Sequence, residues 1–243
     1  MFASLPMYDF PELRDQTDQF WQVIRGYLGE RSIGSPQRLR RDNDLLKQWA
    51  NPNLMLSQTC GCPYRRYLHE KVYLVGTPDL GIDCTSGYYY SCLLTKVGTS
   101  LNSDCWQSLA YNDDHSQSGW VAPIIYAQNR GIRINNYVQT GSHWQSAIEV
   151  SSGRAEVTAV DVSTWHIIKR LAPFASELVV AAKTDETPGL PFITAKSELA
   201  DHLFEAVNFA VQSLTPEQKS ILPFRPLVKI EDSVYQEMED IPK

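Results

Sequence analysis

The stretch from residue 112 to residue 120, Asn-Asp-Asp-His-Ser-Gln-Ser-Gly-Trp, places two serine hydroxyls and a glycine between a short apolar run and a helix-like one. A strand that ends in Ser-x-Ser-Gly and turns directly into a helix directs hydroxyls and unpaired backbone N–H groups at one point, which suits an oxyanion. Serine also caps helices where no ligand binds. The stretch therefore predicts either an anion-binding turn or a plain helix cap, and the rest of the chain has to decide between them.

Polar turns of similar character follow several other predicted strands. Their candidate binding residues are Tyr8, Gln58, Thr59, Ser142, His143 and Asp161. Each has a structural explanation of its own, because Ser142 and Asp161 are good N-caps while Tyr8 and His143 are compatible with simple packing. Hydroxyls, glycines and one imidazole at successive strand ends nevertheless favour a preformed anion cage over chance capping.

Composition excludes several classes of function. The chain has 243 residues, a formal net charge of −6 and 43% hydrophobic residues, which describe an ordinary globular protein with no basic stripe for nucleic acid. No apolar run reaches the roughly 18 residues needed to cross a bilayer. Five cysteines without zinc-type spacing predict neither a metal site nor a clean disulfide framework, and no cofactor fingerprint is present. Free thiols are expected, with a Cys60–Cys84 bridge as the alternative in an oxidising compartment. The N-terminal residues lack the features of a secretory signal, so the chain as written is expected in the cytoplasm.

Hydrophobic periodicity predicts an α/β protein. Strands are expected at residues 2–7, 54–58, 72–75, 88–94, 109–112, 137–140, 157–160, 178–183, 190–194 and 228–230, and helices at 12–28, 45–50, 121–127, 144–150 and 198–214, with a short one near the C-terminus. The alternation of short strands and helices in the middle block indicates a mainly parallel sheet with helices on both faces.

Two long predicted strands, residues 88–94 and 178–183, bracket that middle block. The simplest architecture has one lobe from residues 1–90 and 181–243, a second lobe from residues 91–180, and the two long strands crossing between them as hinges. Ligands bind at the carboxyl ends of strands in open α/β sheets, so a ligand cleft is expected between the lobes.

The ordered set of motifs resembles the phosphonate-type substrate-binding proteins of ABC transporters. The residues that carry the resemblance are Ala3-Ser4-Leu5-Pro6-Met7-Tyr8, Gln58-Thr59-Cys60-Gly61, Tyr90-Ser91, Ser116-Gln117-Ser118-Gly119, Gly141-Ser142-His143 with Ser146, Val160-Asp161 and Pro188-Gly189-Leu190-Pro191. The resemblance covers nearly the whole chain. It implies the two-lobed periplasmic-binding-protein fold (type 2) and, since that family is usually exported, a periplasmic location as the alternative to the cytoplasm.

The resemblance also implies the site and its partners. Ser116, Gln117, Ser118 and His143 would hold the oxyanion of a phosphonate or phosphate ester, and Tyr8, Gln58, Thr59, Tyr90 and Asp161 would shape the remainder. Gly119 and Ser142 complete the expected set of ligand-binding residues. An ABC transporter permease is the implied protein partner, with no catalysis, no metal, no cofactor, no nucleic acid and no insertion into the membrane.

Two other hypotheses stay open. An enzyme on the same scaffold would use His143 with Asp161, or the thiols of Cys60 and Cys62, although no complete set of nucleophile, base and orienting group is visible. A cytoplasmic ligand sensor would contact a regulatory protein through the acidic tail at residues 231–240 or the basic residues 38–41, which otherwise read as solvated segments.

Overall fold

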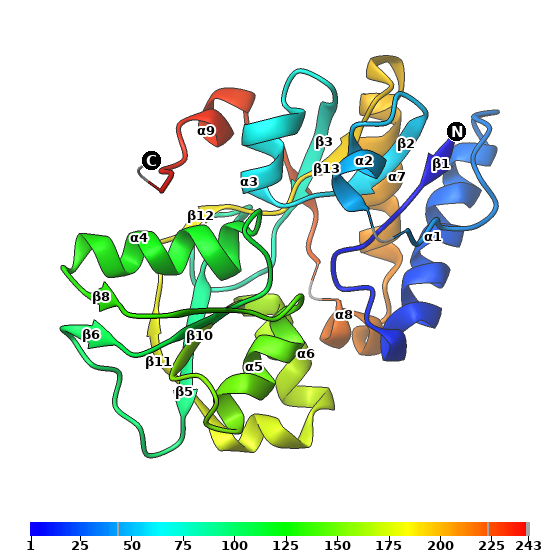
Figure 1. The fold of residues 1–243 in the computed structure, drawn as a ribbon. Helices are drawn as coiled ribbons and strands as arrows, with labels where there is room; N and C mark the ends of the chain where they lie inside the picture. The colour runs from blue at the N-terminus through cyan, green and yellow to red at the C-terminus, as the bar shows by residue number, and fades with distance from the viewer. Residues whose placement is uncertain (43, 223, 242–243) are drawn as a thin grey trace. The chain divides into compact units, whose positions relative to one another are not determined.

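The computed structural model describes residues 1–42, 44–222 and 224–241, which form two compact units (Figure 1). Unit 1 comprises Met1–Tyr88 and Pro188–Glu237, and unit 2 comprises Tyr89–Thr187 and Met238–Lys243. The first two changes of unit lie in β4 (Tyr88–Tyr89) and β12 (Thr187–Pro188), which pair as a two-stranded sheet. The last follows α9, so the chain passes between the units three times.

Unit 1 is built on a five-stranded mixed sheet in the order β1-β2-β13-β3-β14. Its strands are β1 (Phe2–Ala3), β2 (Leu54–Gln58), β3 (Tyr73–Pro78), β13 (Phe192–Thr194) and β14 (Leu227–Val228). Its helices are η1 (Pro11–Leu13), α1 (Arg14–Gly29), α2 (Leu45–Trp49), α3 (Gly61–Pro63), the π-helix η2 (Tyr64–Leu68), η5 (Ser197–Leu199), α7 (Ala200–Ser213), α8 (Pro216–Ile221) and α9 (Asp232–Gln236). Strand β13 runs antiparallel to both β2 and β3, while β1 runs parallel to β2.

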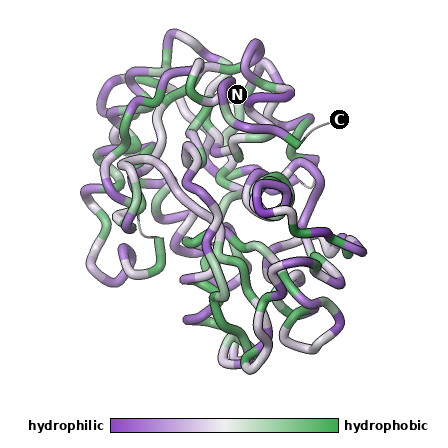
Figure 2. The backbone as a smooth tube through the Cα atoms, turned by 90° about the vertical axis from the view of Figure 1, so that its left-hand side faces the viewer, coloured by the Kyte–Doolittle hydropathy of each residue, from purple (hydrophilic) through white to green (hydrophobic). Residues whose placement is uncertain are grey.

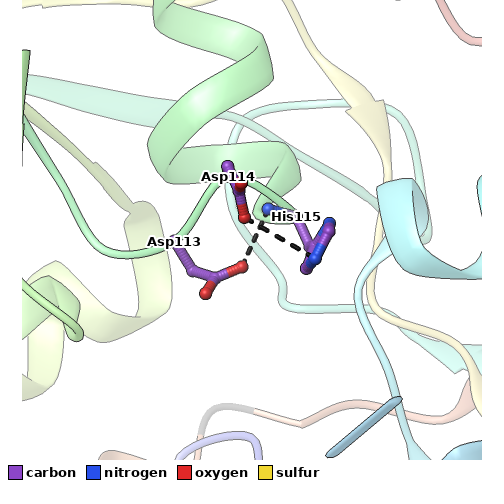
Figure 3. Close-up of side chains that lie close together, drawn as sticks. All are labelled: Asp113, Asp114 and His115. Atoms are coloured by element: carbon purple, nitrogen blue, oxygen red, sulfur yellow. Dashed lines mark hydrogen bonds and ion pairs between the residues drawn. The ribbon is translucent and has the colours of Figure 1, made fainter.

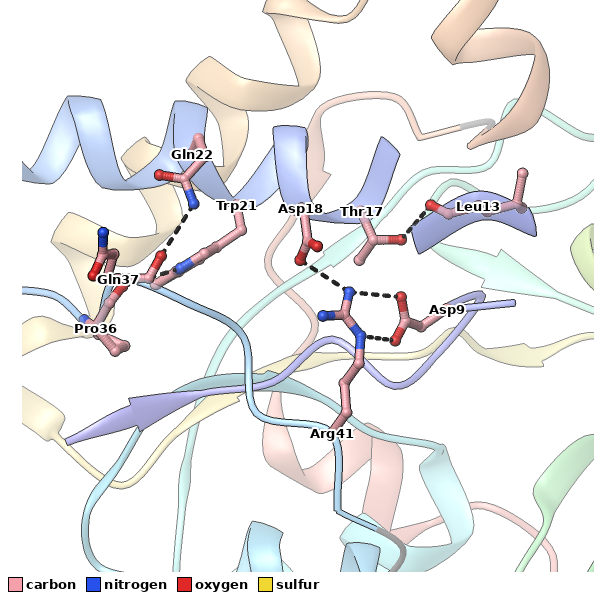
Figure 4. A network of polar contacts seen from close by, with 9 residues as sticks. All are labelled: Asp9, Leu13, Thr17, Asp18, Trp21, Gln22, Pro36, Gln37 and Arg41. Atoms are coloured by element: carbon pink, nitrogen blue, oxygen red, sulfur yellow. Dashed lines mark hydrogen bonds and ion pairs between the residues drawn. The ribbon is translucent and has the colours of Figure 1, made fainter. Parts of the chain in front are cut away.

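The basic segment at residues 38–41, read from the sequence as a solvated loop, is tied to unit 1. Figure 4 shows the Arg41 guanidinium between two carboxylates: its Nε lies 2.6 Å from Asp9 Oδ2, and a terminal nitrogen lies 2.9 Å from Asp18 Oδ1 on α1. The backbone N–H of Arg40 also donates to the carbonyl of Ala3 in β1. Arg41 therefore joins this segment, the turn after β1 and the first helix.

Unit 2 is built on a second five-stranded sheet, in the order β11-β5-β10-β7-β9. Its strands are β5 (Ser91–Lys96), β7 (Leu109–Tyr111), β9 (Tyr137–Gln139), β10 (Val157–Asp161) and β11 (Leu178–Lys183), with a separate pair β6 (Cys105–Trp106) and β8 (Arg133–Ile134). Its helices are the π-helix η3 (Gln117–Val121), α4 (Ala122–Asn129), α5 (His143–Ser151), α6 (Val162–Leu171) and η4 (Pro173–Glu177).

The two long predicted strands are not continuous crossings between the units. The first is divided into β4, which holds one crossing, and β5, and the second corresponds to β11, which ends before the crossing in β12. Strands β5 and β11 pair with each other along their length, antiparallel, and β5 also pairs antiparallel with β10. Both strands therefore belong to the sheet of unit 2, because their backbone groups are satisfied by neighbours in that sheet. Strands β10, β7 and β9 run parallel to one another, as the alternating strands and helices of the middle block predicted.

Helices cover both faces of the unit 2 sheet. Alternate residues of β5 point to opposite faces: Cys92 and Leu94 pack with α5 and α6, whereas Leu93 packs with α4. Figure 1 shows α4 on one side of these strands and α5 and α6 on the other. Because helices pack on both faces of the sheet, the two apolar clusters fix its strands in place. The polar turns at the strand ends are therefore attached to a rigid framework.

Hydrophobic and hydrophilic residues are intermixed along the whole tube in Figure 2. Across the three described segments, no helix combines the length and apolar character required to cross a membrane.

Candidate functional site

The parallel strands of unit 2 bring eight of the predicted site residues to one edge of its sheet. Strands β7, β9 and β10 end at this edge, and a helix begins after each of them: η3 continuing into α4, then α5, then α6. Strand β5 runs the opposite way and so begins here, with Ser91 paired to Asp161. The edge carries Tyr90, Ser116, Gln117, Ser118, Gly119, Ser142, His143 and Asp161.

His143 is the central contact of this edge. Its Nε2 lies 3.0 Å from Ser118 Oγ and 3.7 Å from Asp161 Oδ2, so residues from three different turns meet at one imidazole nitrogen. The side chains of His143 and Asp161 are only 14% and 5% exposed. Ser91 Oγ donates to the carbonyl of Ser118 at 2.9 Å and so fixes the Ser-x-Ser-Gly turn to the start of β5.

Burial lowers the pKa of His143, and the Asp161 carboxylate and the Ala159 carbonyl partly oppose this shift. The imidazole is therefore neutral at pH 7, with one ring nitrogen protonated and the other able to accept a proton. An anionic ligand placed beside it would favour the protonated form.

Position 119 requires a glycine because atoms of neighbouring residues lie close to its Cα. A Cβ at this position would lie 2.0 Å from Asn112 Oδ1 and 2.9 Å from His143 Cε1. The absence of a side chain therefore lets the Ser-x-Ser-Gly turn pack directly on Asn112 and His143. Sequence reasoning did not select Asn112, whose position beside the turn comes from tertiary packing.

The capping hypothesis is correct for three of the polar residues. Ser116 Oγ accepts the N–H of Gly119 at 3.0 Å, and Ser142 Oγ accepts the N–H of Gln145 at 3.0 Å. Asp161 Oδ1 accepts two N–H groups, from residues 163 and 164, at 3.1 and 2.9 Å. These side chains complete the first turns of η3, α5 and α6 and fix the direction in which the helix N-termini point.

Lys183 is a charged residue at this edge that sequence reasoning missed. Its Nζ lies 4.3 Å from the centroid of the Tyr90 ring, a cation–π distance, at the end of β11. The backbone of Tyr90 accepts the N–H of Val162 at 3.1 Å, which places Tyr90 at the start of α6. The signal for Lys183 in the sequence was its position at the end of the long predicted strand at residues 178–183.

The other three predicted residues, Tyr8, Gln58 and Thr59, lie in unit 1 and are buried there. Gln58 Nε2 donates to the Leu190 carbonyl at 3.0 Å, and Thr59 donates its N–H to the Pro191 carbonyl at 3.0 Å. The Tyr8 ring packs against Phe224, and Tyr8 has a φ of 66°, the left-handed region that a tyrosine rarely adopts.

Asp113, Asp114 and His115 form an exposed cluster before the Ser-x-Ser-Gly turn (Figure 3). Their ligand atoms lie within 4.8 Å of one another. The His115 N–H donates to Asp113 Oδ1 at 2.8 Å, and its ring lies 3.6 Å from Asp114. These bonds within the cluster account for its shape as a local turn, and we assign no metal to it.

Comparison with known proteins identifies the family. The model of the periplasmic substrate-binding proteins of phosphonate ABC transporters matches residues 86–235, which is more than half of the chain. The chain belongs to this family. Its members are substrate-binding components of transporters. A comparison with curated protein sequences gave no match.

Solved structures show the same fold. PhnD1 from Prochlorococcus marinus, in complex with methylphosphonate, matches with a TM-score of 0.72 and 13% identity over 97% of this chain and 94% of that chain. XAC2383 from Xanthomonas citri, bound to ATP, matches with a TM-score of 0.68 and 13% identity over 98% and 94% of the two chains. PA3383 from Pseudomonas aeruginosa, a phosphonate transporter component, matches at 0.63 and 15% identity over 92% and 78%. This member of the family therefore has the two-lobed type 2 periplasmic-binding-protein fold.

Proposed function

We propose that this protein is the solute-binding protein of an ABC-type uptake system and binds a small oxyanion, such as a phosphonate or a phosphate ester. The observation that carries the proposal is the meeting of three helix N-termini at one edge of the unit 2 sheet, with Ser118 Oγ and His143 Nε2 in contact at 3.0 Å. Helix N-termini present unpaired N–H groups and partial positive charge, which favour anions.

Hydroxyl, amide and imidazole donors suit a tetrahedral oxyanion better than titrating acids do. Each charge-assisted hydrogen bond to the ligand would contribute about 1.5–3 kcal/mol. Asp161 is an acceptor only, so it opposes a fully ionised oxyanion and favours a ligand that carries an O–H or ammonium group near it. Asp161 therefore acts as the selective element of the proposed site.

We propose that residues of unit 1 also take part in binding the ligand. We expect Tyr8, Gln58 and Thr59 to contact the ligand from unit 1 and the units to close on it as the chain bends at its crossings between them. The partner that takes up the ligand would be a transporter permease. The family favours the periplasm, and fusion of the full-length gene product to a compartment reporter tests that location.

The ligands bound in the structural neighbours support an oxyanion. PhnD1 holds methylphosphonate and XAC2383 holds ATP, and both molecules carry phosphorus oxyanions. Because sequence identity to these neighbours is low, the rest of the ligand has to be inferred from this chain's own residues.

The geometry at His143 supports binding rather than hydrolysis. In a Ser-His-Asp relay the serine contacts Nε2 and the carboxylate contacts Nδ1, so that the carboxylate orients the ring. Here Ser118 Oγ and Asp161 Oδ2 both approach Nε2, at 3.0 and 3.7 Å. Both groups contact the same ring nitrogen, an arrangement that suits polar side chains gathered around a bound ligand.

Thermal shift and titration calorimetry with methylphosphonate, phosphate, AMP and methanesulfonate test the proposal. One of these anions should stabilise the protein without being consumed, by about 2.7 kcal/mol at a hundredfold excess over Kd. Ser118→Ala should weaken its binding at least tenfold. Ser152→Ala is the matched control, because that hydroxyl lies in unit 2 on the exposed end of α5 and bonds the Glu149 carbonyl.

Two results would contradict the site. One is the absence of stabilisation by every anion tested, and the other is equal affinity in the wild type and Ser118→Ala. Consumption of the bound molecule would instead favour an enzyme.

A further inference from the structure

Unit 1 contains a cavity that the proposed oxyanion site does not use. Strand β14 pairs with the end of β3, Leu227 with Pro78 and Val228 with Thr77. Residues 229–231 follow before α9 begins at Asp232, and a cavity of about 320 Å³ is lined by β3, by these residues and by the start of α9. This volume lies at the lower end of the range for small-molecule sites. None of its lining residues belongs to the proposed oxyanion site.

The cavity has an excess of negative charge. Three carboxylates line it, those of Asp201, Glu231 and Asp232, against one ammonium group, that of Lys229. Lys229 Nζ is already paired, 3.0 Å from Asp201 Oδ1, and lies over the Phe204 ring at 5.2 Å. The charges of Glu231 and Asp232 therefore remain to attract a cation.

One of these carboxylates is held in place by a buried phenol. The Tyr64 hydroxyl donates to Asp232 Oδ1 at 2.6 Å, and Tyr64 is only 2% exposed. Burial, followed by the neighbouring Asp232 carboxylate, raises the pKa of Tyr64, so the phenol stays protonated and remains a donor. The Tyr64 ring in turn packs on Tyr235 of α9 with centroids 5.2 Å apart. The position of Asp232 is thus built into the packing of unit 1.

The remaining walls suit the carbon skeleton of a ligand. Val72 and Val75 are buried and apolar, and Tyr73 is 52% exposed, so its ring is accessible from solvent. Carboxylates beside aromatic rings and aliphatic side chains are the combination that recognises ammonium and guanidinium groups, through ion pairing, cation–π contact and apolar burial.

The geometry points to a second binding site in this protein: the unit 1 cavity binds a small organic cation, an amine or guanidinium compound, between Tyr73 and the carboxylates of Glu231 and Asp232. The ligand's charge faces the two carboxylates, and its hydrocarbon part lies on Val72 and Val75.

Titration calorimetry of the full chain with choline, 1,4-diaminobutane and arginine tests this site. At least one cation should bind, and Glu231→Gln and Asp232→Asn should each weaken it about tenfold or more, as expected when a charge-assisted hydrogen bond is removed. Glu217→Gln is the matched control, since it removes the same charge from exposed helix α8 of unit 1 and should leave cation binding unchanged. Tyr73→Ala serves where Asp232→Asn loosens α9, because Tyr73 lies outside the Tyr64–Asp232 bond.

Three outcomes would overturn the site. They are no binding of any cation, equal binding in the wild type and the three cavity variants, and binding only of a capped Gly-Lys-Gly peptide, which would assign the cavity to a partner's side chain. Affinity for methylphosphonate should be the same in the cavity variants and the wild type. A protein that binds cations but no oxyanion would thus disprove the proposed function alone.

Discussion

Gly119→Ala tests whether close packing holds the Ser-x-Ser-Gly turn in place. The added methyl group would lie 2.0 Å from Asn112 Oδ1, whereas ordinary contacts are about 3.4–4 Å, so the turn or Asn112 has to move by more than 1 Å. Overpacking of this kind costs about 1–3 kcal/mol of unfolding free energy. At roughly 2–4 °C per kcal/mol for a chain of this length, the melting temperature should fall by about 2–12 °C.

A double-mutant cycle identifies the cause. Asn112 Oδ1 forms no hydrogen bond within the described structure, so Asn112→Ala alone should cost little. In the Gly119→Ala background it removes the nearest obstacle and should restore more than half of the lost stability. His143 Cε1, at 2.9 Å, is the obstacle that remains. The interaction free energy from the cycle should therefore be clearly non-zero.

The assay is urea and thermal unfolding followed by circular dichroism, with oxyanion affinity measured on the same samples. Gly26→Ala is the control, because a Cβ there meets no atom within 4 Å and the position lies inside helix α1. It should stabilise the protein by about 0.5–1 kcal/mol. A Gly119→Ala protein as stable as the wild type, or strictly additive costs in the cycle, would refute the packing argument.

Three further predictions concern charged groups. Asp161→Ala removes the cap of α6 and should lower the unfolding free energy by about 0.5–2 kcal/mol, measured by urea unfolding. Because burial lowers the pKa of His143 in the fold, the unfolded chain takes up the proton first as pH falls below about 6.5. Stability should therefore decrease with falling pH in that window, and His143→Gln should flatten the profile; identical profiles would contradict this. Arg41→Met leaves Asp9 without its paired guanidinium and should cost about 1–3 kcal/mol, with Arg41→Lys intermediate because it loses the two-pronged contact.

The sequence predicted well the elements that have a clear apolar pattern between turn residues. The strands at residues 54–58 and 178–183 agree with β2 and β11 to the residue. The first strand was predicted too long, since it ends at Ala3, before Pro6 and the left-handed Tyr8. Strands β6 and β8 were missed because two residues carry no periodic signal.

Helix α8 was missed although its start carries a capping box, in which Thr215 and Gln218 bond each other's backbone N–H. That signal was readable from residues 215–218. The direction of β5 in the sheet could not be predicted from the sequence, because a strand has the same composition and periodicity whichever way it runs. Its antiparallel pairing places the long strands inside unit 2 instead of between the units.

Capping and ligand binding were weighed as alternatives from the sequence, but hydroxyl chemistry makes them compatible. A serine that accepts a backbone N–H uses one lone pair and keeps its O–H as a donor. Ser116 and Ser142 are in this state, so each cap fixes the hydroxyl that a ligand oxyanion would need. Asp161 has no proton to give while ionised, and its cap bonds hold a negative charge beside His143. Capping residues thus set the proposed ligand selectivity in two ways. The serines donate hydrogen bonds to the oxyanion, and the Asp161 carboxylate favours a ligand that donates a hydrogen bond to it.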